Sequence, residues 1–467
     1  AHPTRGPPTR GGAHENSTCG ILAAMRCSST VRRTAAFLTQ GMKNRFRAFI
    51  GMGMTLACAM SSLQTTSAQG NQDAPRWLGT WFASSTMRID QPAPQLQDVP
   101  EGRSLDTPPA VLAVAPSQKL VLAAQSPLHF NNQTLRQIVR VTIGGARLRV
   151  VLSNTFGTVP LTIGAAQVGL RERDAAIVPR SNRILTFSGD AATAVPAGAI
   201  LVSDPVDLAV PDGAELAIDL YLPGDTAASG SPLTTHAASW QTNYVSPPGN
   251  HAGAVTMPVQ TTTAYRRSDG LAGSTWFFLT RVEVMAPAQA GAIVTLGDSL
   301  TDGTASMIDT NNRWPDHLAR RLAKAGIRKA VLNAGIGGNR ILNEGNGPSA
   351  LSRFDRDVIA QPGVTHLIVL EGINDIGQAR EKPSPSAADL IRAHTQMIER
   401  AHARGIRVLG ATLTPFEGAN YWTAEGESKR QALNAWIRTS RAYDAVVDFD
   451  AAVRDPSHPT KMRAQYD

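Results

Sequence analysis

From residue 292 onward, short apolar runs alternate with segments of helical periodicity, and this alternation strongly constrains the fold. The runs predicted to be strands cover residues 292–296, 330–333, 365–370, 407–413 and 444–449. Helices are predicted between them, at 314–325, around 351–358, from 386 to 401 and around 433–437. Such an order indicates a doubly wound parallel sheet with right-handed crossovers. The sequence therefore predicts an α/β, flavodoxin-like domain with a five-stranded parallel sheet over residues 291–467.

Residues 77–285 show strand and turn patterns without a long helical period. Alternation or β-branched residues mark the segments 134–143, 148–152, 161–170, 183–187 and 217–222, and glycine, proline and asparagine separate them. A chain of 467 residues is also too long for one typical core. We therefore predict an all-β sandwich domain at 77–285, joined by a short linker of small residues to the α/β domain.

The segment 236–251 is predicted to be a long loop that carries Trp240 and Tyr244. Two interpretations are open. Exposed aromatic rings would form part of a sugar-binding rim, whereas buried rings would make Trp240 a cap on the sandwich. The second is favoured, because large aromatic side chains are mostly buried.

The N-terminal residues have the features of a leader. Residues 1–41 lack periodicity and are predicted to be an unstructured upstream segment. Residues 42–68 combine a basic start, an apolar run at 48–60 and a small-residue cleavage site, which predicts a cleavable signal peptide and a secreted or periplasmic protein without a stable membrane anchor. Lipidation at Cys58 is the alternative, but residues 55–57 match a lipoprotein signal poorly.

Charge and cysteine content argue against several classes of function. The chain carries a net charge of +8, but residues 1–68 hold 8 of its 45 Lys and Arg and 1 of its 37 Asp and Glu, which leaves +1 for the rest. Binding to nucleic acid is therefore not expected. All three cysteines also precede residue 69, and the sequence has no HExxH motif and no P-loop, so we expect no disulfide, metal or cofactor.

Polar and glycine-rich turns follow the first three predicted strands of the α/β domain. Ser299 follows the first strand in a Gly-Asp-Ser turn, a glycine-dense turn at 333–339 follows the second, and Asn374 follows the third. The carboxyl ends of parallel strands meet at one edge of a sheet, where such folds bind their ligands. At this edge, the serine hydroxyl would be a nucleophile, and a backbone N–H of the glycine-dense turn and the asparagine carboxamide would form an oxyanion hole.

The motifs GDSLTDG, NAGIGGN and GINDIG occur in this order and resemble those of the SGNH hydrolase superfamily, the GDSL esterases and lipases. The resemblance covers residue 293 to the C-terminus. It implies that Ser299 is the nucleophile and that the oxyanion is held by the Ser299 N–H, the Gly338 N–H and the Asn374 side chain. Gly337 is a possible alternative to Gly338 but fits the motif less well. The β-rich segment looks like the accessory domain of some secreted bacterial members.

The resemblance implies a serine esterase that hydrolyses acyl or acetyl esters of small molecules or glycans through an acyl-enzyme. The competing hypothesis is a non-catalytic, exported carbohydrate-binding protein with a degenerate hydrolase domain. A fluorophosphonate label on Ser299 would distinguish the two.

Relatives carry the histidine base and its aspartate in an Asp-x-x-His-Pro motif ahead of a last helix. Asp455 and His458 match this motif, but they follow the fifth predicted strand closely and no predicted helix comes after them. We therefore expect His458 to be an ordinary loop residue and the catalytic pair to lie beyond residue 467, in a domain that is truncated here. The alternative is that Asp455 and His458 are the pair. His317 and His394 are expected to be packed in helices.

Overall fold

The computed structural model describes residues 74–88, 129–266, 272–379 and 381–466. The chain divides into two compact units, residues 1–70 and residues 71–467, and all described residues belong to the second unit. The predicted upstream segment, signal peptide and cysteines lie outside the described residues.

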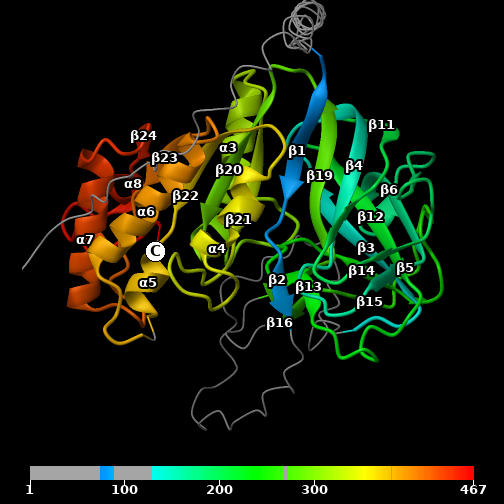
Figure 1. Cartoon of the computed structure of the whole chain (residues 1–467), viewed down its shortest axis with the longest axis horizontal. Helices are drawn as coiled ribbons and strands as arrows, with labels where there is room; N and C mark the ends of the chain where they lie inside the picture. The colour runs from blue at the N-terminus through cyan, green and yellow to red at the C-terminus, as the bar shows by residue number, and fades with distance from the viewer. Residues whose placement is uncertain (1–73, 89–128, 267–271, 380, 467) are drawn as a thin grey trace, which may run out of the picture. The chain divides into compact units, whose positions relative to one another are not determined.

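The first part of the described chain is β-rich, as predicted, and consists of several antiparallel sheets (Figure 1). One sheet has the order β1 (Arg76–Phe82), β19 (Leu279–Ala286), β4 (Gly145–Ser153) and β10 (Ile200–Val202), with β11 (Val206–Val210) also paired to β4. A larger sheet has the order β15 (Thr261–Thr262), β14 (Tyr244–Pro248), β3 (Gln133–Arg140), β12 (Glu215–Leu222), β6 (Ala165–Arg173) and β7 (Ala176–Ile177), with β8 (Arg183–Leu185) paired to β6. The remaining strands form small sheets: β18 (Trp276–Phe277), β13 (Leu233–His236) and β2 (Thr86–Arg88) in one, β16 (Tyr265–Arg266) and β17 (Ala272–Gly273) in another, and β5 (Leu161–Ile163) and β9 (Thr193–Val195) in a third.

The second part is an α/β domain around a five-stranded sheet whose neighbouring strands are all parallel. The strand order is β21 (Lys329–Gly335), β20 (Gly291–Gly297), β22 (Val364–Leu370), β23 (Arg407–Ala411) and β24 (Ala445–Val447). In chain order this is 2-1-3-4-5, an order known from doubly wound sheets. The helices are α2 (Ser299–Asp302), α3 (Trp314–Lys324), α4 (Ala350–Phe354), α5 (Ile373–Gly377), α6 (Ala387–His402), α7 (Ala424–Thr439) and α8 (Phe449–Val453), with one π-helical turn, η1 (Asp355–Ile359).

Several element boundaries follow from local chemistry. Ser386 and Asp389 form the capping box that begins α6, and Gly326, at φ +69°, ends the α3 segment. Two of the differences from the predicted elements have a local cause. The predicted strand 161–170 is split at Gly164, where a Cβ would lie 2.7 Å from the Tyr221 ring. The predicted fifth strand ends early, because the Asp448 side chain caps α8.

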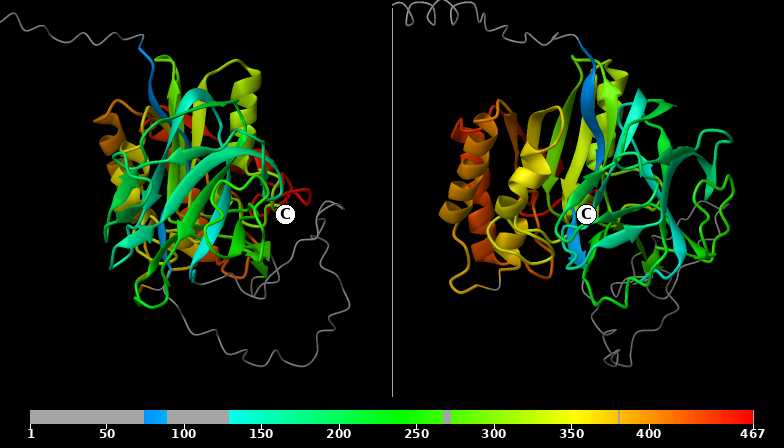
Figure 2. Two further views of the ribbon diagram at one scale, coloured as in Figure 1. Left: turned by 90° about the vertical axis from the view of Figure 1, so that its right-hand side faces the viewer. Right: turned by 45° about the vertical axis from the view of Figure 1, so that its right-hand side comes forward.

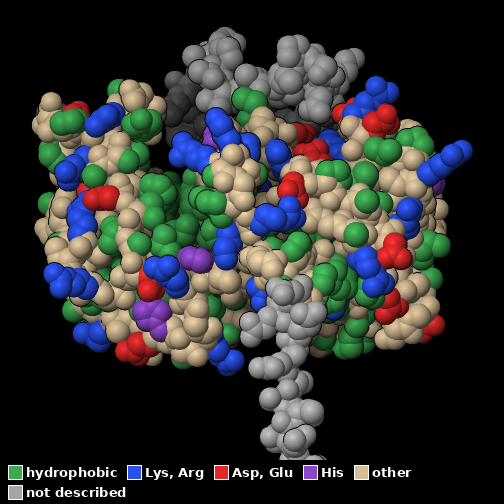
Figure 3. Space-filling model, turned by 90° about the horizontal axis from the view of Figure 1, so that it is seen from above, with side chains coloured by type: hydrophobic (Ala, Val, Ile, Leu, Met, Phe, Trp, Pro, Cys, Tyr) green, Lys and Arg blue, Asp and Glu red, His purple; other side chains and the backbone are tan. Residues whose placement is uncertain are grey.

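The β-rich part and the parallel sheet share one continuous hydrophobic core. β1 packs against β21 as well as pairing with β19, and Figure 2 shows this strand in blue between the two parts. At Gly79, a Cβ would lie 3.0 Å from Leu332 Cδ1, and the Gly79 N–H donates to the Pro362 carbonyl at 3.1 Å. The predicted linker therefore joins two layers that are packed against each other. On the face shown in Figure 3, charged side chains of both signs are spread over the surface.

Replacement of Leu332 by Ala should destabilise both parts together. This side chain is fully buried where β21 meets β1, so we expect the free energy of unfolding to fall by about 2–5 kcal/mol. Because the core is continuous, calorimetry should still show one transition. Ile184→Ala, at a side chain that is 59% exposed, is the control and should change stability little. Separate melting of the two parts would contradict this prediction.

Candidate active site

A pocket of about 760 Å³ lies where β20, β21 and β22 end. The α/β domain contributes Ser299, Asp302, Thr304, Ile336, Gly337, Gly338, Glu344, Gly345, Asn346, Gly347, Pro348, Asn374, Gln378 and Tyr421. The β-rich part contributes Thr86, Met87, Phe156, Thr235, His236, Ala237 and Ala238. The three residues expected from sequence to act together, Ser299, Gly338 and Asn374, thus line one pocket.

Ser299 is the first residue of α2 and is partly exposed to this pocket. The turn that presents it needs glycine at position 297, because a Cβ there would lie 2.6 Å from the Leu370 carbonyl oxygen. Asp298 caps α2 by accepting the Leu300 N–H at 2.9 Å. The serine therefore lies on a tight strand-to-helix turn, with its N–H at the start of a helix.

The glycine-rich loop after β21 leaves one backbone amide for a ligand. The Gly337 N–H already donates to Asp302 Oδ2 at 2.8 Å, so it is not available. Among the described residues, none accepts a hydrogen bond from the Gly338 N–H. Gly338 has φ +73°, and a Cβ there would lie 2.1 Å from Asn346 Nδ2, so only glycine fits. This geometry favours Gly338 over Gly337 as the oxyanion donor.

Two hydrogen bonds fix the orientation of the buried Asn374 side chain. Its Nδ2 donates to the Asn339 carbonyl at 2.9 Å, and its Oδ1 accepts from Gln378 Nε2 at 2.9 Å. A carboxamide nitrogen carries two hydrogens, so one N–H of Asn374 remains for a group in the pocket.

The guanidinium of Arg353 lies beneath these loops and is fully buried. It donates to the carbonyls of Gly297 at 3.2 Å and Ala334 at 2.7 Å, which are near the ends of β20 and β21. It also donates to Asn339 Oδ1 at 2.8 Å and to Ser84 Oγ, from the β-rich part, at 3.0 Å. One cation therefore connects the serine turn, the glycine-rich loop and the residue that orients Asn374.

Three carboxyl groups beneath the site have raised pKa values. Burial raises the pKa of Asp298 to about 7 and that of Glu371 well above its ordinary value. Burial also raises the pKa of Asp375 to about 6, although the N–H groups of Ile341 and Leu342 favour its ionised form. Burial thus favours the protonated form of Glu371, and Asp298 is close to its midpoint near neutral pH.

The histidines considered from sequence do not complete a triad. The His458 side chain is 71% exposed, its Nδ1 lies 3.7 Å from Asp455 Oδ2, and neither residue lines the pocket. His394 is buried against the Tyr443 hydroxyl, and burial lowers its pKa to about 4; His317 lies in α3. His236, which was not predicted as a site residue, lines the pocket, but both of its ring nitrogens are hydrogen-bonded to protein groups.

The aromatic residues of the segment 236–251 are packed. Trp240 is 3% exposed and Tyr244 is 7% exposed. The hypothesis of a sugar-binding rim built from these two rings is wrong, and the alternative of a packed segment holds.

Within the described ranges, no group of His, Asp and Glu side chains could hold a metal ion. No helix in the same part of the chain has the length and apolar character needed to cross a membrane.

Comparison with known proteins places a family match on the α/β domain. Residues 295–467 match the model of the GDSL-like Lipase/Acylhydrolase family. This match agrees with the resemblance to the SGNH superfamily that the motifs of the α/β domain indicated. The match to this family supports ester hydrolysis as the general class of reaction of the α/β domain. No curated protein matches the chain.

Solved structures that resemble the chain include three named as esterases or lipases. AlinE4, an SGNH-hydrolase family esterase, is 22% identical over 36% of this chain and 80% of its own, with a TM-score of 0.29. A GDSL-like lipase from Bacteroides thetaiotaomicron is 19% identical over 38% and 76%, with a TM-score of 0.29. The aryl esterase of M. smegmatis is 16% identical over 37% and 91%, with a TM-score of 0.30.

Asp298→Asn should weaken the dependence of stability on pH. The pKa of Asp298 is about 7 in the folded protein, whereas the unfolded chain releases this proton near the ordinary aspartate pKa of 3.8. The contribution of this group to stability is therefore complete below about pH 4 and falls as the pH rises to about 7. Asparagine keeps an oxygen for the Leu300 N–H and cannot ionise. Melting temperatures from pH 4 to 8 should fall less in this variant than in the wild type or in Asp207→Asn, at an exposed carboxyl. An unchanged slope would contradict the assignment.

Proposed function

We propose that this protein is a serine esterase that uses an acyl-enzyme. The main support is that Ser299, the Gly338 amide and Asn374 line one pocket, and that protein groups leave the Gly338 N–H and one Asn374 N–H unused. Ser299 Oγ attacks the ester carbonyl carbon, and the oxyanion accepts hydrogen bonds from the Ser299 N–H, the Gly338 N–H and Asn374 Nδ2. The C–O bond breaks, the alcohol leaves with a proton, and water then hydrolyses the acyl-serine.

The pocket is large enough for more than a simple acetyl ester. Its volume of about 760 Å³ falls in the range of ligand sites that hold drug-sized molecules. We propose a small-molecule or glycan ester as the substrate. We further propose export through residues 42–68, to the periplasm or the medium.

The second candidate is a non-catalytic, exported carbohydrate-binding protein. One observation favours it: among the described histidines, none lines the pocket with an unbonded ring nitrogen that could accept the Ser299 proton. For the esterase, this observation means that no described histidine supplies the general base, so turnover should be low.

Labelling of Ser299 distinguishes these candidates. An esterase should react with a fluorophosphonate probe at Ser299 and hydrolyse p-nitrophenyl acetate above the background rate, and Ser299→Ala should abolish both. Intact-mass spectrometry and peptide mapping would identify the labelled residue. Absence of label, together with binding of a glycan, would favour the binding protein. His458→Ala should leave the rate unchanged; a complete loss of activity would instead make Asp455 and His458 the catalytic pair.

Asn374→Ala should lower kcat by roughly a hundredfold to a thousandfold, because one donor to the oxyanion is lost. The KM should change far less, since the oxyanion forms only in the transition state. Steady-state kinetics with p-nitrophenyl acetate would measure both constants. Asn250→Ala, at an exposed asparagine of the β-rich part, serves as the matched control. Equal turnover in the two variants would remove Asn374 from this role.

A further inference from the structure

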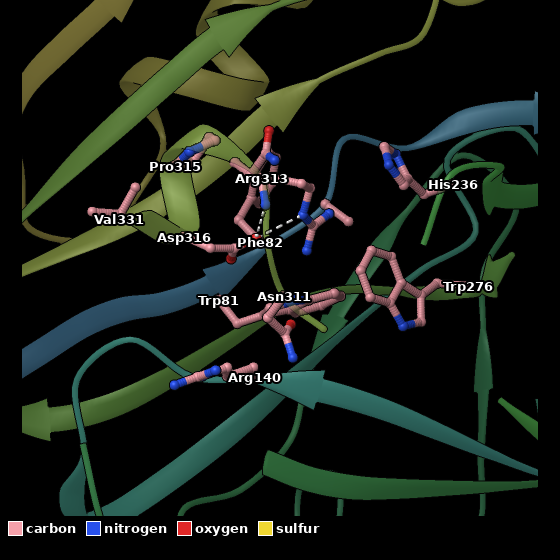
Figure 4. Close-up of a pocket in the computed structure, with 12 residues that line it drawn as sticks. Trp81, Phe82, Arg140, His236, Trp276, Asn311, Arg313, Pro315, Asp316 and Val331 are labelled. Atoms are coloured by element: carbon pink, nitrogen blue, oxygen red, sulfur yellow. Dashed lines mark hydrogen bonds and ion pairs between the residues drawn. The ribbon is translucent and has the colours of Figure 1, made fainter. Parts of the chain in front are cut away.

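His236 comes from the β-rich part, at the end of β13, yet it lines the pocket of the α/β domain. The side chain is 4% exposed. Its ring packs on Trp276, with centroids 5.8 Å apart, and the Arg313 guanidinium lies over the same indole at 6.0 Å. Figure 4 shows these side chains among those that line a second, small cavity of about 20 Å³, with room for about one water molecule. The imidazole is therefore largely enclosed by protein.

Both ring nitrogens of His236 face oxygen atoms. Nδ1 lies 2.8 Å from the Ser84 carbonyl oxygen, and Nε2 lies 3.0 Å from Asp302 Oδ1. A carbonyl oxygen can only accept, so Nδ1 carries a hydrogen, and one further proton lies between Nε2 and the carboxyl group. Neither nitrogen is left for Ser299. This arrangement suits a residue that holds another group in place and does not suit a general base.

The group that His236 holds is connected to the oxyanion loop. Asp302 is 2% exposed, and its second oxygen, Oδ2, accepts the Gly337 N–H at 2.8 Å. Gly337 directly precedes Gly338, whose N–H is the proposed oxyanion donor. The direction of that N–H depends on the peptide between the two glycines, which Asp302 restrains from one side.

We propose that His236 is a positioning residue for the oxyanion hole. It orients Asp302, and Asp302 fixes the Gly337–Gly338 turn so that the Gly338 N–H faces the pocket. The β-rich part thus completes the active site of the α/β domain. This inference rests on the proposed esterase function, because only that function gives the Gly338 amide a catalytic role.

The test compares His236→Ala with His251→Ala, which removes an imidazole from the same β-rich part but away from the pocket. With p-nitrophenyl acetate, His236→Ala should lower kcat about 10- to 100-fold with little change in KM, as a misplaced catalytic group does. His251→Ala should behave as the wild type. Asp302→Ala should lower kcat by about the same factor as His236→Ala. Asp302→Asn should recover much of this loss, because its amide can bond both the imidazole and the Gly337 N–H.

Hydrogen exchange provides a readout that does not require turnover. In His236→Ala, exchange should accelerate in the peptide that contains residues 335–339 and remain unchanged in peptides from β3 and β12. If the wild type hydrolyses no ester, the proposed function fails, and exchange at this loop still decides whether His236 positions it. If the kcat of His236→Ala and the exchange rate of its 335–339 peptide both equal those of the wild type, the inference is overturned. Uniformly faster exchange would also overturn it, since it would indicate a structural role only.

Discussion

The site depends on one buried cation, the guanidinium of Arg353. A charge without access to water is stable only if its hydrogens find acceptors and an anion lies close. Here the acceptors are backbone and side-chain oxygens of the site loops, and Asp357 supplies the anion at 3.2 Å. Because the guanidinium is planar and its donor directions are fixed, it sets the spacing between the Gly297 turn and the Asn339 loop. The loops that carry Ser299 and Gly338 are thus held by one rigid group.

Ser84 joins the β-rich part to this arrangement. Its hydroxyl accepts from Arg353, and its carbonyl accepts from His236, so one residue contacts both groups that hold the site loops. The segment between β1 and β2 therefore serves as a bridge, and β1 already lies against β21 in the common core. Movement of the β-rich part away from the sheet would break these bonds. The β-rich part is better described as one wall of the pocket that contains Ser299 than as an appended module.

The sequence predicted those features of the fold and site that are encoded locally. Apolar runs and turn residues located β20, β21 and β22, and the three motifs located the loops that line the pocket. The roles of Arg353 and His236 were not predicted, because each depends on partners far away in the chain. Arg353 lies in a short helix, where an arginine is usually solvated, and its burial results from carbonyls on separate strands. His236 meets Asp302 only when the two parts of the chain pack together, so no spacing in the sequence signals the pair.

Two buried carboxyl groups, those of Glu371 and Asp298, affect the electrostatic environment of Ser299. Glu371 and Asp298 are both buried, and burial is the main cause of both raised pKa values, to which the Asp298 charge adds at Glu371. While these two groups are protonated, they place no negative charge beside the N–H groups around Ser299, where a charge would oppose an oxyanion. Ionisation of Asp298 above about pH 7 would place an anion next to Ser299, where it would oppose a second negative charge. Burial of these groups thus limits the negative charge near Ser299. The nearby Arg353 cation has the opposite effect on Glu371, because it favours the ionised form of that carboxyl group. That Glu371 nevertheless has a raised pKa indicates that desolvation outweighs this attraction.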